Sequence, residues 1–212
     1  GILGIRDEVR PEAIEAIAEV QDAGVQIVMI TGDRRETAVA IAKDAGLLQR
    51  PNELVWTSAE LAEMSDEQVK LELHKLRVVA RALPMDKSRL VRLAQEMNLV
   101  VGMTGDGVND SPALKKADVG FAMGSGTEVA KEAGDIVILD DNFLSIKQAI
   151  LYGRTIYNSI CKFIVFQLTI NFSAVAINFI APFIGIDKPL TITQILWINL
   201  VTVSYTHLTL PT

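Results

Sequence analysis

Short runs of apolar residues alternate along the chain with stretches in which apolar residues recur every three or four positions. The apolar runs, each short enough for a buried strand, are 25–31, 75–82, 98–104, 118–123 and 135–140. The periodic stretches, which are typical of amphipathic helices, are 11–24, 34–46 and 85–98. This alternation predicts an α/β fold in which a doubly wound parallel sheet is covered by helices on both faces.

The pattern changes in two places. Residues 50–74 show no clear period, and we expect one or two helices there, including 65–76. After Asp141 a helical pattern continues without a breaker towards a long apolar segment, in which Lys162 is the only charged residue between Ile160 and Ile186. A segment of this length can cross a bilayer, for which about 20 residues are needed.

The expected organisation therefore has four parts. Residues 1–144 form a soluble domain, and residues 145–186 form a connecting helix with one complete transmembrane helix. Residues 190–202 begin a second transmembrane helix, and residues 203–212 form a tail that fits neither part. Because Gly1 opens inside an apparent strand, we expect the chain to be a fragment of a longer protein.

Composition narrows the function classes. The net charge of −6 gives no sign of a nucleic-acid partner. The single cysteine, Cys161, excludes an internal disulfide framework and fits a reducing compartment. Residues 1–15 carry charges and lack the apolar core of a signal peptide.

A cluster of oxygen-bearing side chains follows the apolar run 98–104. Asp106, Asn109 and Asp110 stand within five residues, and Gly105 and Gly107 flank the first aspartate. Ligands of doubly wound sheets bind outside the carboxyl ends of the strands, so this loop lies at the expected ligand edge. Oxygen ligands without histidine or cysteine suit Mg²⁺ serving a phosphate. The alternative is a loop whose Asp and Asn residues only cap and turn.

Two further strand ends carry related chemistry. Thr31, Gly32 and Asp33 follow the run 25–31, and the hydroxyl with the backbone N–H groups before the next helix could bind an anion. Lys87 stands in the first turn of the helix after the run 75–82 and could reach a phosphoryl oxygen. Taken alone, Lys87 would be interpreted as a surface residue, but the three strand ends together predict a phosphoryl site.

These segments resemble the P-type cation-transporting ATPases, and among them the plasma-membrane-type calcium pumps. The similarity is carried by "MITGD" (29–33), by "DKSRLV" (86–91) and by the whole of 103–143. The resemblance implies a haloacid-dehalogenase-like fold, ATP as substrate, Mg²⁺ as cofactor and an aspartyl-phosphate intermediate.

The resemblance also implies roles for single residues. Asp106 and Asp110 would ligate Mg²⁺, with Asn109 supporting its position. Thr31, Gly32, Asp33 and Lys87 would hold the phosphoryl group, and Asp7, Arg10 and Lys87 would lie near the nucleotide. The aspartate nucleophile of the family lies in an aspartate-lysine-threonine-glycine-threonine motif, which this chain lacks. The chain alone is therefore expected neither to autophosphorylate nor to pump.

Amide side chains interrupt the apolar segments at Gln167, Asn171, Asn178 and Asn199. Polar residues inside membrane helices are often functional, although amides also join helices to one another. Asn171 and Asn199 match the ion-ligating asparagines of calcium pumps. Ala174 resembles the plasma-membrane type, whereas pumps of the sarcoplasmic-reticulum type carry glutamate there. The resemblance implies one Ca²⁺ per cycle, an integral protein of the plasma membrane, and a cytoplasmic location for residues 1–155; sodium, potassium and manganese remain open.

The tail departs from the family at Val203, where the pumps carry an aspartate. One reverse translation of residues 203–212 resembles a transposon-based sequencing adaptor, so we expect this segment to be non-native, with a genuine divergent terminus as the alternative. Rival functions are a membrane-tethered haloacid-dehalogenase phosphatase, a pump for another cation, and a non-catalytic membrane subunit that binds Mg²⁺ or nucleotide.

Overall fold

The computed structural model describes residues 9–186 and 190–209. The chain divides into two compact units, residues 1–149 and residues 150–212. Asp7, one of the predicted nucleotide residues, lies outside the described residues.

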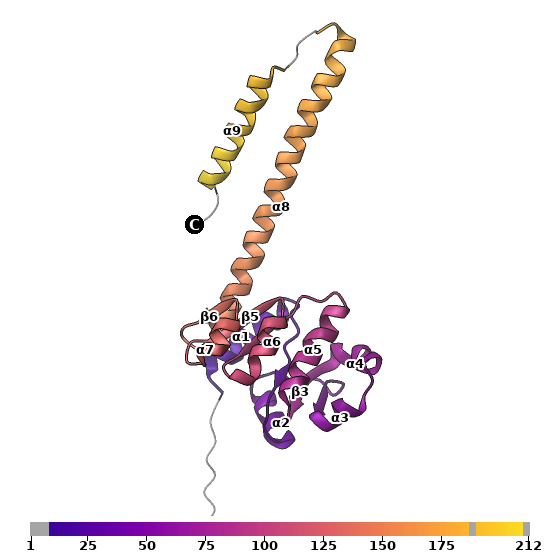
Figure 1. Cartoon of the computed structure of the whole chain (residues 1–212), viewed down its shortest axis with the longest axis vertical. Coiled ribbons are helices and arrows are strands. Elements are labelled where there is room, and N and C mark those ends of the chain that lie inside the picture. The colour runs from indigo at the N-terminus through magenta and orange to yellow at the C-terminus, as the bar shows by residue number, and fades with distance from the viewer. Residues whose placement is uncertain (1–8, 187–189, 210–212) are drawn as a thin grey trace, which may run out of the picture. The chain divides into compact units, whose positions relative to one another are not determined.

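The first unit alternates strands with helices (Figure 1). Its strands are β1 (Met29–Ile30), β2 (Leu54–Thr57), β3 (Leu76–Ala80), β4 (Gly102–Gly105), β5 (Val119–Met123) and β6 (Ile136–Ile138). Its helices are α1 (Pro11–Asp22), α2 (Arg35–Asp44), α3 (Ser58–Glu63), α4 (Asp66–Glu72), α5 (Pro84–Glu96), α6 (Ser111–Lys116) and α7 (Glu128–Ala133). Two 3₁₀ turns, η1 (Leu73–Lys75) and η2 (Val108–Asp110), complete it, and α8 (Phe143–Ile180) begins in it.

All strand pairs of this unit are parallel, as the alternation predicts. They form two three-stranded sheets, in the orders β1-β3-β2 and β4-β5-β6, where the sequence suggested one continuous sheet. Among the described residues, β1 and β4 are therefore each paired on one side only. Two of the three strands that precede the predicted phosphoryl segments are thus edge strands, and the third, β3, lies in the middle of its sheet.

Helices cover both faces of the first sheet, which confirms the predicted packing. Leu76 and Val79 of β3 join one apolar cluster with residues of α3, α4 and α5. Val78 and Ala80, on either side of Val79 in the sequence, join a second cluster with residues of α1 and α2. From Val78 to Ala80 the two clusters alternate with the two-residue period of side chains along a strand, whereas Leu76, the first residue of β3, does not follow it.

The strands differ from the prediction in two respects. β2 lies in the segment 50–74, for which the sequence suggested helices only, and it pairs with β3 from Leu54 to Thr57. The apolar run 25–31 contributes only Met29 and Ile30 to the sheet, where they pair with Val78 and Val79. Ahead of them the Gln26 side chain donates to the carbonyls of Leu73 and Leu76, at 2.7 and 2.8 Å. The apolar run 25–31 is thus longer than the part of it that pairs in the sheet.

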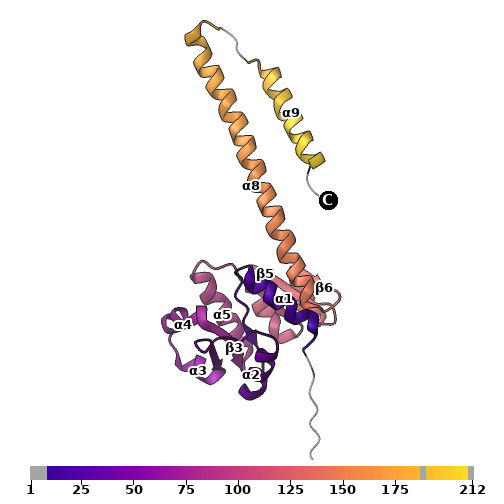
Figure 2. The same cartoon turned by 180° about the vertical axis from the view of Figure 1, so that it is seen from behind.

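The second unit contains the remainder of α8, the 3₁₀ turn η3 (Ala181–Ile184) and helix α9 (Ile192–Thr209). Within the part of the chain that the structure describes, one helical stretch, Phe143–Ile184, is long and apolar enough to cross a membrane. α8 and α9 run side by side in opposite directions (Figures 1 and 2) and are joined by a hydrogen bond from Gln167 to Asn199. The backbone of α9 is helical as far as Thr209, within the segment that we expected to be non-native.

Candidate functional site

The predicted phosphoryl residues lie in loops and helix starts that follow β1, β3 and β4. Lys87 and Asp110 meet directly, since Lys87 Nζ lies 2.5 Å from Asp110 Oδ1. Both side chains are largely buried, with exposed fractions of 20% and 9%. The pair links α5, which packs on the first sheet, to the loop that follows β4 in the second. The pair therefore joins two of the three strand ends from which the sequence predicted a phosphoryl site.

Asp110 is held by the backbone as well as by Lys87. Its Oδ2 accepts hydrogen bonds from the N–H groups of Asp106 and Gly107, each at 3.3 Å. Gly105 leaves the necessary room, because a Cβ there would lie 2.4 Å from the Asp110 Cβ. Asp110 is also the N-cap residue of α6. Gly105 is thus required by packing against the buried carboxylate.

Lys87 is positioned by the start of α5. The buried Asp86 side chain accepts a hydrogen bond from the Leu83 N–H at 2.8 Å, which satisfies one of the free donors at this helix N-terminus. Lys87 follows directly in the same helical turn. The sequence analysis did not single out Asp86, although an aspartate in the first turn after a proline is a recognisable helix-start signal.

Asp106 is supported by a glycine loop that the sequence analysis also missed. The Thr127 N–H donates to the Asp106 carbonyl at 2.8 Å, and a Cβ at Gly126 would approach the same oxygen to 2.8 Å. The loop, residues 124–127, follows β5 and therefore lies at the same edge of the second sheet. A glycine pair after a buried strand is the signal that could have identified it.

The carboxylates of this loop suit a magnesium ion that also binds phosphate. Asp106 and Asn109 are exposed at the edge, whereas Asp110 is buried. Among the described residues no group of three or more histidine, cysteine, aspartate or glutamate side chains could hold a metal ion. Mg²⁺ commonly takes one or two carboxylates and completes its shell with water and substrate oxygens. The chemistry of Asp106 and Asp110 therefore fits Mg²⁺.

The loop after β1 is ordered by its own side chains. Thr31 Oγ1 donates to Asp33 Oδ2 at 2.9 Å and accepts from the Asp33 N–H at 3.1 Å. Backbone hydrogen bonds join it to the segment after β3, from Arg81 N–H to the Asp33 carbonyl and from Ala82 N–H to the Thr31 carbonyl, each at 2.9 Å. Gly32 is exposed between Thr31 and Asp33. Thr31, Gly32 and Asp33 thus form a compact turn at the carboxyl end of the first sheet.

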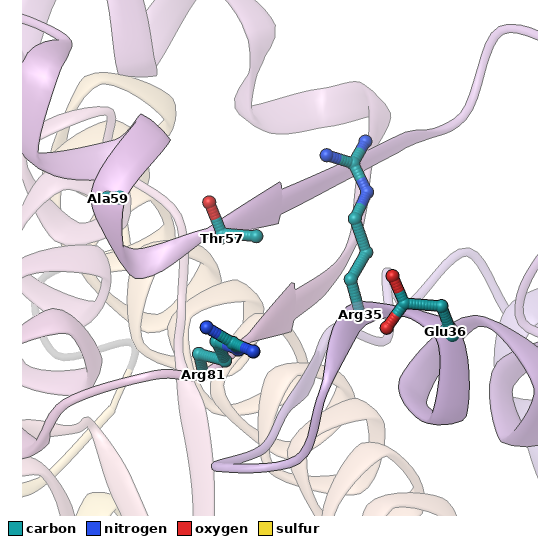
Figure 3. Close-up of a pocket in the computed structure, with 5 residues that line it drawn as sticks. All are labelled: Arg35, Glu36, Thr57, Ala59 and Arg81. Atoms are coloured by element: carbon teal, nitrogen blue, oxygen red, sulfur yellow. The ribbon is translucent and has the colours of Figure 1, made fainter.

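An open pocket of about 260 Å³ lies next to this turn (Figure 3). It is lined by Arg35, Glu36, Thr57, Ala59 and Arg81. Arg35 is held by Glu60 Oε1 at 2.9 Å and by the Val55 carbonyl at 3.2 Å. Arg81 has a φ of 50°, a left-handed conformation that is uncommon for arginine and often marks a functional segment. Neither arginine was expected from the sequence to belong to the site.

Arg10, the other predicted nucleotide residue, is the N-cap of α1 and lies near Asp141. Hydrogen bonds from Ser125 hold the pKa of the Asp141 carboxyl below its usual value, and the charge of Arg10 lowers that pKa further. Ser125 belongs to the glycine loop that supports Asp106. Arg10 is therefore associated with the edge of the second sheet.

In the second unit the structure pairs Asn199 with Gln167, whose Nε2 lies 3.0 Å from Asn199 Oδ1. Asn171, one turn further along α8, is exposed. Asn178 donates to the carbonyl of Ala174 in its own helix at 3.0 Å. Asn171 and Asn199, the two predicted cation ligands, are thus not directly hydrogen-bonded to each other.

Comparison with known proteins identifies the family to which the first unit is similar. Two families described as haloacid dehalogenase-like hydrolase match residues 1–118 and residues 89–150. The chain belongs to the haloacid dehalogenase-like hydrolases. The haloacid-dehalogenase-like fold predicted from the sequence is thereby confirmed. Its oxygen-rich loops lie at the carboxyl ends of parallel strands, where ligands of open α/β sheets bind.

Several curated relatives of this haloacid dehalogenase-like chain are calcium-transporting ATPases. It is 46% identical to the plasma membrane calcium-transporting ATPase 3 of Homo sapiens, with 100% of this chain and 18% of the relative covered. It is 47% identical to the plasma membrane-type calcium-transporting ATPase 12 of Arabidopsis thaliana, with 95% and 20% covered. The chain thus spans about a fifth of the length of these relatives.

A solved structure of another cation-transporting ATPase is also similar to this chain. A zinc-transporting PIB-type ATPase in the E2.Pi state matches with a TM-score of 0.65 and 28% identity, over 96% of this chain and 27% of that chain. The resemblance to P-type cation-transporting ATPases, with relatives of the plasma-membrane calcium type, is confirmed.

Proposed function

We propose that the chain is part of an ATP-driven calcium-transporting ATPase that works through an aspartyl-phosphate intermediate. It would comprise the C-terminal part of the phosphorylation domain, 1–144, the complete helix of 145–186 and the start of the next membrane helix, 190–202. The observation that carries the proposal is the Lys87–Asp110 pair beside Asp106, at the carboxyl ends of parallel strands. The 46–47% identity to calcium-transporting ATPases supports calcium as the cargo.

The aspartate nucleophile would come from a strand outside this chain. β1 and β4 are both edge strands, and each leads into one of the phosphoryl loops. A parallel strand inserted between them would join the two sheets into one and would end at the same edge. Ser111 Oγ, which is buried without a hydrogen-bond partner among the described residues, lies at the start of α6 beside Asp110 and could contact that segment.

The residues of the chain would then divide the work of phosphoryl transfer. Lys87 would neutralise charge on the phosphoryl oxygens, and the Thr31 hydroxyl with the backbone of Gly32 and Asp33 would hydrogen-bond them. Asp110, fixed by Lys87 and the loop N–H groups, would hold the loop in place with Asn109. Asp106 and Asp110 would hold Mg²⁺, which stabilises the negative charge of the transferring group.

ATP would be bound at the edge of the domain. The pocket beside Thr31–Asp33 presents Arg35 and Arg81, whose guanidinium groups suit an anionic nucleotide. Arg10 and Asp7 are further proposed contacts with the nucleotide, carried by the resemblance of their segment. The remainder of the nucleotide site would belong to parts of the pump outside this chain.

The second unit would carry the cation. Asn171 and Asn199 offer amide oxygens of the kind that Ca²⁺ prefers, and Ala174 favours the plasma-membrane type of pump. The apolar part of the helical stretch Phe143–Ile184, from Ile160 onward, would lie in the lipid bilayer, and residues 1–155 would face the cytoplasm, where ATP is available. The zinc-transporting neighbour identifies the competing hypothesis, a pump for another divalent cation.

The first experiment is to read the source gene across both ends of the chain. An upstream aspartate-lysine-threonine-glycine-threonine motif and an aspartate codon at position 203 would support a calcium pump with a non-native tail. The complete protein should then take up Ca²⁺ in vesicles and bind one Ca²⁺ per cycle. A genuine Val203 without an upstream nucleophile would overturn the transport function. The purified chain itself should take up no stable label from γ-labelled ATP.

A further inference from the structure

The amide of Gln167 is only half satisfied. Its Nε2 donates to Asn199 Oδ1 at 3.0 Å. Its Oε1 is buried and has no hydrogen-bond partner among the residues that the structure describes. Leaving a buried acceptor unpaired costs free energy, so such atoms are rare and usually have a functional explanation.

The arrangement leaves one amide oxygen available in either orientation of the pair. Two carboxamides joined by a single hydrogen bond use one N–H donor and one oxygen, whichever residue donates. One oxygen therefore stays unpaired between α8 and α9. Oxygen atoms of this kind are ligands for hard divalent cations.

Asn178 shows how the same helix satisfies an amide that has no such role. Its Nδ2 donates to the Ala174 carbonyl one turn earlier, at 3.0 Å, within α8. Gln167 instead reaches across to α9 and contacts Asn199, the residue proposed as a cation ligand. Asn171 follows Gln167 by four residues and lies on the same side of the helix.

We propose that Gln167 is a ligand of the transported divalent cation. Its Oε1 binds the cation, while its Nε2 holds the side-chain amide of Asn199 in position. This inference rests on the proposed function, since it requires a transported cation. A role confined to joining the two helices is the competing explanation, because amides commonly bridge membrane helices.

The test uses the complete pump in its native membrane and measures phosphoenzyme formed from γ-labelled ATP as the Ca²⁺ concentration is varied. Gln167→Leu should raise the Ca²⁺ concentration for half-maximal phosphorylation by about 10- to 100-fold, while the maximal level is retained. Gln167→Glu keeps an oxygen at the site and should restore most of the affinity. Asn178→Leu, which removes an amide from the same helix, is the matched control and should leave the affinity unchanged.

The outcomes separate the two proposals. If the unaltered pump shows Ca²⁺-dependent phosphorylation but Gln167→Leu changes only the maximal level, as expected from a loss of the bond that joins the two helices, the ligand role is refuted and the pump remains. If the unaltered pump shows no cation-dependent phosphorylation, the proposed function fails and the role of Gln167 fails with it. Equal affinity loss in Gln167→Leu and Asn178→Leu would also contradict the inference, because Asn178 is bonded within its own helix.

Discussion

At the scale of single residues, Asp110 organises the site through close contacts. A buried carboxylate needs compensating charge and hydrogen bonds, and here Lys87 and two backbone N–H groups supply them. The absence of a side chain at Gly105 lets the carboxylate sit against the end of β4. The geometry of the loop therefore depends on one charge pair and one missing methyl group.

Gly105→Ala should destabilise the chain by about 1–3 kcal/mol, because the new Cβ would overlap Asp110 and force the loop to shift. Gly32→Ala is the matched control for stability, since a Cβ there meets nothing within 4 Å. Thermal melting of both variants checks the prediction. Equal melting temperatures for the two variants would contradict the prediction, because they would show that the loop accommodates a Cβ at position 105.

Lys87→Met should destabilise the chain by about 1–3 kcal/mol, because it leaves the buried Asp110 carboxylate without its counter-charge. Asp110→Asn in the same background should recover part of the loss, since the uncompensated charge is then removed. Denaturant unfolding of the two single variants and the double variant measures the coupling. Additive effects would contradict a direct energetic link between the residues.

Some of these features could be predicted from the sequence. Asp106, Asp110 and Lys87 were placed correctly at strand ends or helix starts, because apolar runs locate strands and because parallel strands share a ligand edge. The Lys87–Asp110 contact could not be predicted, since it joins residues 23 positions apart through the packing of α5 against the second sheet. The Gln167–Asn199 bond was missed for the same reason, since it depends on the rotation of two helices.

At the scale of elements, α5 is fixed from its outer side by charged residues. Asp66, at the start of α4, accepts hydrogen bonds from Arg89 and Arg92 of α5 at 2.7 Å each. Arg89 also donates to the Leu61 and Met64 carbonyls, at 2.6 and 2.7 Å. Because α5 carries Lys87 in its first turn, these hydrogen bonds from Arg89 and Arg92 help to hold the lysine in position. These contacts involve residues 61–66, in a segment that shows no clear period in the sequence. The strand β2 was not predicted there because it is only four residues long and leads directly into α3.

Asp66→Asn should lower the melting temperature at neutral pH but not in acid. Hydrogen bonds from Arg92 and Arg89 lower the pKa of Asp66 below its ordinary value of 3.8. A lowered folded-state pKa means that the stabilisation is complete above about pH 4 and disappears as the pH falls through the folded-state value. Melting curves recorded from pH 7 to pH 2 should therefore converge for the two proteins. Glu63→Gln, an exposed change on α3, is the control; a pH-independent difference would assign the effect of Asp66→Asn to packing.

At the scale of the whole molecule, the strands of the first unit form two separate parallel sheets. Within the part of the chain that the structure describes, β3 and β5 are paired on both sides, whereas β1 and β4 each have one unpaired edge. Open strand edges leave backbone groups without partners and favour pairing with another strand. The parallel α/β sheet was predictable from the alternation of strands and helices, and the haloacid-dehalogenase-like fold from the resemblance. The division into two sheets was not, because no local pattern shows which strands lack a neighbour.

Hydrogen exchange should report this difference. In the isolated chain, peptides that contain β1 and β4 should exchange faster than peptides that contain β3 and β5, because local opening is easier at an edge. In the complete protein the nucleophile strand should cover both edges and slow the exchange of β1 and β4. Mass spectrometry of the two proteins makes the comparison. Unchanged exchange at β1 and β4 in the complete protein would show that no strand is inserted there.

The continuity of α8 has a consequence for how the gene can change. The helix runs for 38 residues from the first unit into the second, and each residue turns it by about 100°. Deleting one codon within it would rotate Gln167 and Asn171 by that angle relative to the domain, whereas inserting seven would restore their heading to within about 20°. Natural insertions and deletions in this helix should therefore be limited to lengths that leave Gln167 and Asn171 pointing in nearly the same direction.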